Sequence, residues 1–409
     1  MSLSEPSKNT PSGIPPENGF PLFSRQQLEV LAAGSIASVF GPLFDQQEAY
    51  ARQVRMPMPP MLLADRVMRI DAKPGSMGTG TIWTETDVRA DAWYLHRDRM
   101  PAGLMLEAGQ ADLLLISWLG IDFKNKGLRV YRLLNFKLTY HGGLPRSGDT
   151  LSYEIHIDSH VGSENDLFIF HFDCRIDGHL RLKAIGYAGF FTDDELATSR
   201  GVVWDAATCK FDQAAHVSLP AFSSRRTHFS AAQVSAFAQG QLYDCFGPGF
   251  ELTCTHRDPP RISSHHLQLF DKVTHYDPCG GPWKRGYLRA ELAITPKSWF
   301  FESHFLNDPC MPGTLMFDGT LQVMAFYLTA LGYSIDKDGW HFEPIPGEPW
   351  ELLCRGQVIP QSKQLTYELF VEELHDEPVP ALYAAVLCTV DGLKAFHVRR
   401  MGYRLTPAE

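Results

Sequence analysis

Residues 299–331 read WFFESHFLNDPCMPGTLMFDGTLQVMAFYLTAL, and this stretch decides the fold. Its second half, 315–331, is apolar nearly all round, and Asp318 is its one charged residue. A helix of that composition has to be buried, so we expect it at the centre of the protein. Pro309 and Pro312 interrupt regular structure just before it, which predicts that the helix begins at the Met-Pro-Gly segment.

The same pattern is written twice along the chain. Identical residues recur at a constant separation of 206 positions. The matching pairs are Phe23-Ser24 with Phe229-Ser230, Gly34 with Gly240, Phe40-Gly41-Pro42 with Phe246-Gly247-Pro248, Asp65 with Asp271, Val67 with Val273, Asp71 with Asp277, and Trp93 with Trp299. The separation then rises to 211, because five extra residues precede Met311-Pro312, the counterpart of Met100-Pro101. Such self-similarity predicts two copies of one structural unit.

Both copies have the same expected order of elements. Each has a helical segment (26–40 and 232–246), a strand (81–88 and 286–294), a long apolar helix (104–119 and 315–331) and several further strands. Apolar and polar residues alternate over 151–158, which is typical of a half-buried strand. One buried helix wrapped by an antiparallel sheet is a hot-dog fold. We therefore predict an α+β double hot-dog, in which two antiparallel sheets each wrap a long central helix, forming an intrachain pseudodimer.

The extent of the repeat predicts the domain organisation. Residues 1–22 are rich in Pro and Ser, and we expect them to be a disordered head. The N-terminal hot-dog is expected at 23–195 and the C-terminal hot-dog at 229–409. Residues 196–228 fall outside both copies and are expected to be a linker.

The composition excludes several classes of protein. The chain has 409 residues, 44% of them hydrophobic, enough for two or three packed domains. Its 37 Lys and Arg stand against 47 Asp and Glu, which argues against a nucleic-acid-binding protein. Its eight cysteines include no CxxC pair, which favours free thiols in a reducing compartment, the cytoplasm, over a metal site. Neither a signal peptide nor a membrane span is expected, because the apolar runs are far shorter than the roughly 20 residues that a span needs.

The segment before the buried helix combines groups that suit proton transfer on a carbonyl compound. His304 can take a proton, and Gly313 lets a substrate approach the backbone closely where the helix begins. A helix N-terminus presents free N–H groups and positive charge, which stabilise an oxygen that acquires negative charge. Asp318 lies farther along the same helix.

This segment resembles the active-site segment of bacterial 3-hydroxyacyl-acyl-carrier-protein dehydratases of fatty acid synthesis, specifically the type that can also isomerise the double bond. The matching residues are His304-Phe305, Asp308-Pro309-Cys310-Met311-Pro312-Gly313, and Asp318 fourteen positions after the histidine. The first copy, at 91–95, 100–103 and 107–112, is similar to dehydratase domains of bacterial polyunsaturated fatty acid synthases. The resemblance covers roughly 23–408.

The first copy departs from the family pattern. Its loop is five residues shorter, and counting back from Met100 without a gap puts Trp93 at the position of the catalytic histidine. His96 is nearby but out of register. The first copy keeps a carboxylate, Glu107, in alignment with Asp318. It is therefore expected to be a pseudo-domain without a base of its own.

The resemblance implies how the copies cooperate. In this family the histidine of one hot-dog works with the carboxylate of the other, which implies one active site per chain, formed by His304 and Glu107. Gly313 would supply the oxyanion N–H, with Met311 and Pro312 beside the substrate. If the pairing ran within one copy instead, Asp318 would be the acid.

The resemblance also implies a reaction and its partners. The substrate would be a 3-hydroxyacyl chain on the phosphopantetheine of an acyl carrier protein, dehydrated to a trans-2-enoyl thioester. No metal and no redox cofactor are expected, and other domains of a fatty acid or polyketide megasynthase are expected partners. A monomer and a homodimer both remain open. The alternatives are a dehydratase that also isomerises the double bond, a hot-dog thioesterase, and a non-catalytic scaffold.

Overall fold

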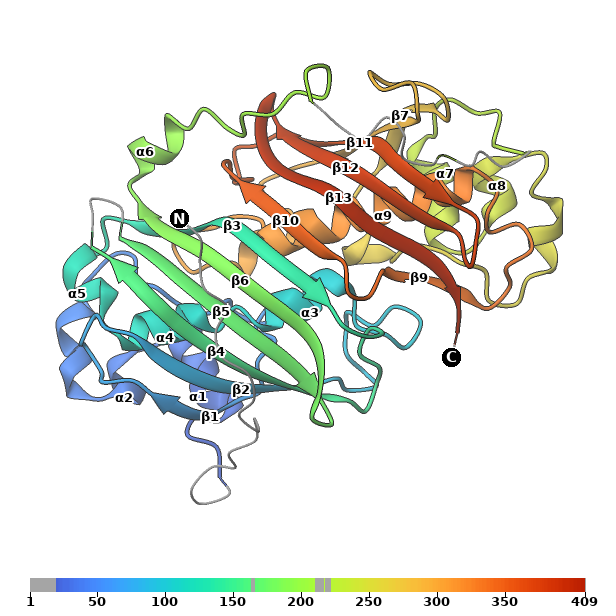
Figure 1. Ribbon diagram of the computed structural model, residues 1–409. Helices are drawn as coiled ribbons and strands as arrows, with labels where there is room; N and C mark the ends of the chain where they lie inside the picture. Colours follow the sequence, from blue (N-terminus) through green and yellow to red (C-terminus); the bar gives the residue numbers. More distant parts are fainter. Residues whose placement is uncertain (1–19, 163–165, 210–216, 218–221, 409) are drawn as a thin grey trace.

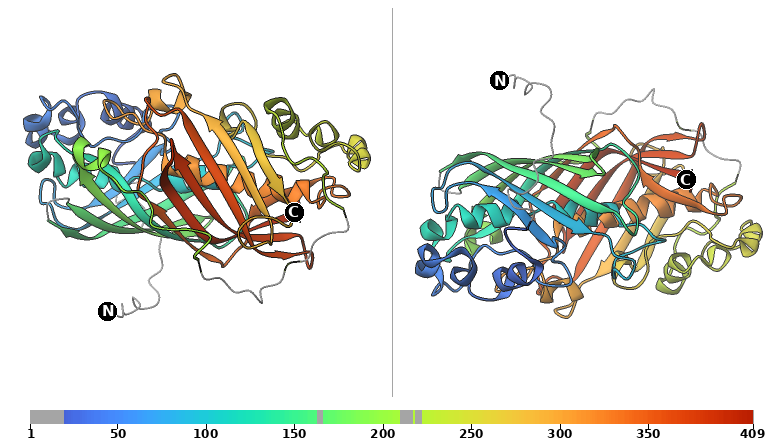
Figure 2. Two further views of the ribbon diagram at one scale, coloured as in Figure 1. Left: turned by 90° about the horizontal axis from the view of Figure 1, so that it is seen from above. Right: turned by 90° about the horizontal axis from the view of Figure 1, so that it is seen from below.

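The computed structural model describes residues 20–162, 166–209, 217 and 222–408 and places the two copies end to end (Figures 1 and 2). The first half contains α1 (Arg25–Ala33), α2 (Ala37–Phe40), β1 (Arg66–Asp71), β2 (Gly80–Asp87), α3 (Ala102–Ala108), α4 (Asp112–Trp118), α5 (Ile121–Asn125), β3 (Val130–Tyr140), β4 (Thr150–Val161), β5 (Leu167–Ile176), β6 (His179–Phe191) and α6 (Asp193–Ala197). The second half contains α7 (Ala231–Ala238), α8 (Leu242–Phe246), β7 (Lys272–Asp277), β8 (Tyr287–Ala293), α9 (Gly313–Ala330), β9 (Trp340–Pro344), β10 (Pro349–Cys354), β11 (Gln364–His375), β12 (Ala381–Val390) and β13 (Leu393–Pro407).

The strand order has internal two-fold symmetry. The continuous sheet runs β1-β2-β4-β5-β6-β3 in the first half and β10-β13-β12-β11-β8-β7 in the second, so the second half repeats the first in reverse. The halves join where β3 and β10 pair antiparallel, from Pro349 opposite Thr139 to Leu353 opposite Asn135. The strands lie in front of α3, α4 and α9 in Figure 1. The double hot-dog predicted from the repeat is confirmed.

The central helices differ between the halves. In α9 every residue after Gly313 is buried, as its apolar sequence predicts. In the first half the expected single helix over 104–119 is wrong, because α3 ends at Ala108 and α4 begins at Asp112. Gly109 stands at the break, where an added Cβ would lie 2.6 Å from the ring of Phe172 on β5. The sheet therefore approaches the backbone too closely for any side chain at this position.

The repeated polar residues have the same structural duty in both halves. Ser24 and Ser230 each form a capping box that starts α1 and α7, with Gln27 and Gln233 as the reciprocal partners. The expected helical segments 26–40 and 232–246 are not continuous. Each is divided into two short helices, α1 with α2 and α7 with α8.

Trp93 and Trp299 meet each other across the two halves. Their ring centroids are 5.2 Å apart, and residues related by a two-fold axis can touch only near that axis. The Trp93 indole donates to the carbonyl of Pro60, and the Trp299 indole donates to that of His266. Trp93 is thus the counterpart of Trp299, and the prediction that it occupies the place of His304 is wrong. The five extra residues after Trp299 carry the histidine instead.

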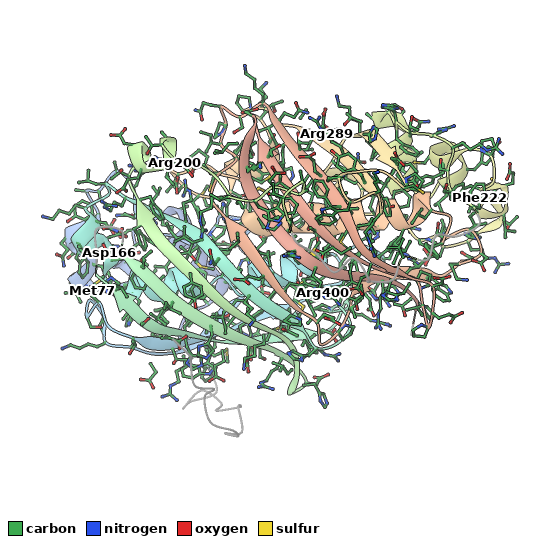
Figure 3. All side chains as sticks on the ribbon, turned by 45° about the horizontal axis from the view of Figure 1, so that its top comes forward. Met77, Asp166, Arg200, Phe222, Arg289 and Arg400 are labelled. Carbon is green, nitrogen blue, oxygen red and sulfur yellow. The ribbon has the colours of Figure 1, made fainter. Side chains whose placement is uncertain are left out.

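Residues 202–206, in the segment between the copies, lie against the sheet of the second half. Figure 3 labels Arg200 near α6 at the start of this segment. The Val202 N–H donates to Lys394 O on β13 at 2.7 Å, and Trp204 packs against Phe370 and His397. Most of the predicted head, 1–22, lies outside the described residues, and the domain boundaries stay predictions. In the part of the chain that the structure describes, no helix is long and apolar enough to cross a membrane.

Candidate active site

His304 lies in the loop between a 3₁₀ turn, Trp299–Glu302, and α9. Its side chain is buried, and Nδ1 lies 2.9 Å from the carbonyl oxygen of Cys310. A carbonyl oxygen only accepts hydrogen bonds, so Nδ1 carries the proton and Nε2 keeps its lone pair. The loop thereby fixes both the tautomer and the direction of the ring. Nε2 is free to act as a base.

Glu107 reaches this histidine from the other half. It lies on α3, and its Oε1 is 3.8 Å from Nε2 of His304. Its other oxygen, Oε2, accepts a hydrogen bond from the Thr314 hydroxyl at 2.5 Å. Thr314 belongs to the first turn of α9, so contributions from both halves converge at one point.

Burial gives the two groups complementary protonation states. Desolvation lowers the pKa of His304 to about 3, which leaves the imidazole neutral near pH 7. Desolvation raises the pKa of Glu107 to about 7, against a smaller lowering by the Thr314 hydrogen bond. The site therefore holds a neutral base beside a carboxyl group that keeps a proton to near neutral pH. General acid–base catalysis needs this combination.

The N-terminus of α9 opens into the same cavity. Its first residue, Gly313, has an N–H that finds no acceptor in the described part of the chain. An added Cβ at Gly313 would meet no atom within 4 Å, so the position faces open space. Pro312 is the N-cap of α9, and the Met311 N–H donates to Val358 O at 2.9 Å. Met311 and Gly313 line the cavity, whereas Pro312 holds the helix start behind it.

An arginine from the first half holds the histidine loop. Arg132 on β3 makes a bidentate pair with Asp308, at 2.6 and 2.7 Å. Arg132 also donates to Gln357 at 2.8 Å, and both members of the ion pair are mostly shielded from solvent. A fork of this kind restricts direction as well as distance. Arg132 therefore fixes the loop of one half against the sheet of the other.

Besides Arg132 and Thr314, two further polar groups near the site were not predicted from the sequence. Gln110 lies in the break between α3 and α4, lines the cavity, and has a buried Nε2 with no partner among the described residues. Behind it, Asp112 is fully buried and accepts the Tyr131 hydroxyl at 2.7 Å. Burial raises the pKa of Asp112 to about 8. Gly109 could have revealed Gln110, because an isolated glycine inside an apolar helix pattern can mark a break in the helix, and Gln110 lies in that break.

Asp318 lies away from this pair. Its Oδ1 accepts the Gly103 N–H at 3.1 Å and its Oδ2 accepts from Gln322 at 3.3 Å. It lines a different cavity, on the side of the shorter loop of the first half. The structure thus brings His304, Glu107 and Gly313 together and leaves Asp318 apart. Their catalytic roles stay predictions.

The cavity lined by Glu107, His304 and Gly313 can accommodate an apolar chain with a reactive carbonyl at the start of α9. Its apolar lining includes Leu113, Leu133, Phe305, Met316 and Cys354. Within the described ranges, no group of three His, Cys, Asp or Glu residues could hold a metal ion. The arrangement can remove a proton at one point, donate one at a second and stabilise an oxyanion at a third.

Comparison with known families gives a match over both halves. Residues 56–184 and 262–399 match the FabA-like domain family. Each matched segment contains one of the cavity-facing helices, α3 or α9. Each matched segment lies within one copy of the repeat.

One relative of known name and two solved structures show what this chain is similar to. A polyunsaturated fatty acid synthase component from Thraustochytrium sp. is 31% identical over 369 residues, which are 86% of this chain and 24% of that protein. This chain therefore spans about a quarter of that relative. The dehydratase domain from the CurK module of curacin polyketide synthase has a TM-score of 0.40 and 13% identity, covering 85% of this chain and 96% of that domain. The 12:0-ACP thioesterase of Umbellularia californica has a TM-score of 0.39 and 12% identity, covering 80% and 94%.

Proposed function

The chain belongs to the FabA-like domain family, and we propose that it dehydrates 3-hydroxyacyl thioesters to trans-2-enoyl thioesters. One observation carries this proposal. The buried pair of His304 and Glu107, 3.8 Å apart, stands beside the free N–H of Gly313. That arrangement supplies a base, an acid and an oxyanion donor in a cavity between the two halves.

The first step breaks the bond between the α-carbon and its proton. Nε2 of His304 takes the proton, because Nδ1 is already committed to the Cys310 carbonyl. The electron pair moves onto the thioester oxygen, which becomes an enolate oxygen. The Gly313 N–H, at the positive end of α9, stabilises that charge.

The second step expels the β-hydroxyl group. Glu107 donates its proton to the hydroxyl oxygen, the carbon–oxygen bond breaks, and water leaves as the C2–C3 double bond forms. Glu107 is then a carboxylate beside a protonated His304, so return of the proton across this short distance restores both groups. The net reaction converts one 3-hydroxyacyl thioester into one enoyl thioester and one water.

The carrier and the setting are part of the proposal. The relative from Thraustochytrium is a component of a polyunsaturated fatty acid synthase, which supports an acyl carrier protein as donor and a megasynthase as context. A phosphopantetheine arm would deliver the thioester to Gly313. No metal or redox cofactor enters the proposed steps.

The test is turnover of a 3-hydroxyacyl pantetheine thioester, with products separated by mass spectrometry. Wild type should form the enoyl thioester, and His304→Ala should lose about 100- to 10,000-fold in rate, the usual contribution of a general base. His171→Ala is the matched control, because this histidine pairs with Asp158 on the surface of the sheet. It should keep full activity.

Other products would contradict the proposal in informative ways. Release of the free 3-hydroxy acid would identify a thioesterase. Formation of a 3-enoyl product in addition to the 2-enoyl product would show that the enzyme also isomerises the double bond. A folded wild type without turnover of any such thioester would favour the scaffold.

A further inference from the structure

A second cavity lies on the opposite side of the contact between α3 and α9. It is related to the catalytic cavity by the internal repeat, with Asp318 in the place of Glu107 and Ala102 in the place of Gly313. Its apolar lining includes Met100, Pro101, Ala102, Leu144, Leu321 and Ala325. The shape of an acyl-binding cavity therefore exists twice in this chain.

Among the described residues, the second cavity lacks a histidine–carboxyl pair like that of His304 and Glu107. No ion pair or hydrogen bond joins a histidine to Asp318 among the described residues. His96 lines the cavity, and its Nε2 donates to the Arg261 carbonyl at 3.0 Å, so the lone pair of this ring lies on Nδ1. An acyl chain bound here would meet the buried carboxyl group of Asp318, which among the described residues is hydrogen-bonded to Gly103 and Gln322 and not to a histidine.

The mouth of the second cavity is strongly basic. Arg99, Leu144 and His341 line both this cavity and an adjoining surface pocket that also contains Arg146 and Arg181. After burial, the charge of Arg146 is the largest cause that lowers the pKa of Arg99, so these guanidinium groups act on each other. Like charges gathered in this way attract an anion.

The acidic residues of the pocket are already engaged. Glu343 pairs with Arg404 at 2.5 Å, and Asp149 accepts the backbone N–H of Arg146 at 2.7 Å. By contrast, no described residue forms a hydrogen bond or ion pair with the Arg99 or Arg181 side chain, and the buried Nε of Arg181 is unpartnered.

His341 adds an independent sign of a missing ligand. Its side chain is only 9% exposed and lines both the cavity and the pocket. Nε2 contacts Glu343 at 3.3 Å, but Nδ1 is buried without a partner. Buried polar atoms are nearly always satisfied, so an orphan at this junction points to a polar ligand.

We propose that the second cavity is a non-catalytic binding site for an acyl phosphopantetheine thioester. The acyl chain occupies the apolar floor beside Asp318, and the phosphate lies between Arg99, Arg146 and Arg181. The thioester class rests on the proposed function, because it is carried over from the catalytic cavity. The anionic head rests on the arginines alone.

The test uses octanoyl phosphopantetheine amide, which has no 3-hydroxyl group and no thioester and therefore survives intact. Isothermal titration calorimetry on the whole chain should give two equivalents bound. The double variant R99Q/R181Q should weaken one equivalent at least tenfold, since each hydrogen bond to a charged group contributes about a factor of ten. The matched control R69Q/R89Q removes two surface arginines away from either cavity and should keep both equivalents.

Further arms identify the source of binding. Octanoyl pantetheine amide, which lacks the phosphate, should bind more weakly only at the second site. Inorganic phosphate should compete weakly with the full probe at that site. If inorganic phosphate binds as tightly as the full probe, the site is an anion site and the acyl part of the proposal is wrong. Leu144 lines both the second cavity and the surface pocket, so the larger side chain in Leu144→Trp should also remove one bound equivalent. This variant serves as a second route should the double variant fail to fold.

The two proposals can fail separately. A single equivalent in wild type, or a second equivalent that ignores both R99Q/R181Q and Leu144→Trp, would overturn the second site while dehydration stands. Binding of two equivalents of the amide without turnover of a 3-hydroxyacyl thioester would support the second site and contradict the proposed reaction.

Discussion

The two cavities on either side of the α3–α9 contact share one frame and differ in chemistry. In one, Glu107 lies 3.8 Å from His304, and Gln110 presents a free amide nitrogen. In the other, Asp318 is bound by the Gly103 N–H and by Gln322, whose remaining hydrogen bonds go to the backbone of 267 and 269. The first cavity leaves its polar groups available to a substrate, whereas the second ties its carboxyl group into the scaffold.

The difference arises from five residues. Before Trp299 the copies align without a gap, and after Met311 they align again. The extra residues between these points extend the loop that carries His304, and Arg132 of the other half holds that loop through Asp308. Chemistry in this frame thus depends on one loop and its restraint, because both helices already bring a carboxyl group to the seam.

The sharpest test of the comparison exchanges carboxyl for amide in each cavity. Glu107→Gln should reduce kcat by about 100- to 10,000-fold, because an amide cannot donate the proton that the leaving hydroxyl needs. Asp318→Asn, the matched change, should alter kcat by less than about threefold. Steady-state dehydration kinetics measure both. A loss confined to Asp318→Asn would mean that the acid and its cavity are assigned the wrong way round.

A graded series at Gly313 should give the next largest effect. Gly313→Ala adds a Cβ that meets no atom within 4 Å, so it should be tolerated within a few-fold. Gly313→Leu projects into the cavity and should move the carbonyl away from the N–H, with a loss of about 100-fold in kcat/KM. Thermal unfolding of both variants should match wild type. Equal activity of the two variants would place the substrate elsewhere.

The restraint on the histidine loop should contribute less. Arg132→Met should lower kcat by roughly tenfold, because His304 loses its fixed direction when Asp308 is released. Asp308→Asn should act similarly, and the double variant should be no worse than either single one if the two residues act through one contact. Additive losses in this double-mutant cycle would show that Arg132 acts on the substrate instead.

The repeat predicts most of the frame but little of the detail. Constant spacing identifies two copies because equivalent residues do equivalent work, as the capping boxes at Ser24 and Ser230 show. The break after Ala108 is different. It depends on Phe172, which approaches Gly109 from β5, and periodicity along one helix carries no information about a distant strand.

The candidate site divides in the same way. His304 and Gly313 belong to one local motif, so their proximity is readable from spacing. Arg132 and Gln110 come from the other half, and their roles depend on the pairing of β3 with β10 and on the helix break. Trp93 was aligned with His304 by mistake, because counting back from Met100 without a gap ignored the five-residue insertion after Trp299.

The pH dependence of kcat should respond to Thr314, which donates a hydrogen bond to Glu107 in the catalytic cavity. Activity needs protonated Glu107, so kcat should fall as pH rises through its pKa of about 7. Thr314→Val removes a hydrogen bond that favours the carboxylate, which raises this pKa and moves the alkaline limb to higher pH. Thr329→Val, on the same helix with its hydroxyl on Ala325 O, should leave the limb unchanged. An alkaline limb that stays in place in Thr314→Val would show that another group sets it.

The free energy of unfolding should depend on pH in the same direction for Glu107 and Asp318, because both carboxyl groups are buried. Burial raises the pKa of Glu107 from 4.5 to about 7 and that of Asp318 from 3.8 to about 6. Each folded-state pKa lies above its unfolded value, so the folded state loses stability as pH rises from the unfolded pKa through the folded one. At about 1.4 kcal/mol per pKa unit, each group should reduce the free energy of unfolding by on the order of 3 kcal/mol at about pH 8 relative to about pH 4.

Urea unfolding at these two pH values measures this penalty in each cavity. Glu107→Gln and Asp318→Asn should both gain stability over wild type at the higher pH and little at the lower one. Only the first should lose activity, because only Glu107 faces His304. If Asp318→Asn gained stability and Glu107→Gln did not, the catalytic carboxyl group would already be ionised without penalty. It could not then serve as the acid of the proposed dehydration.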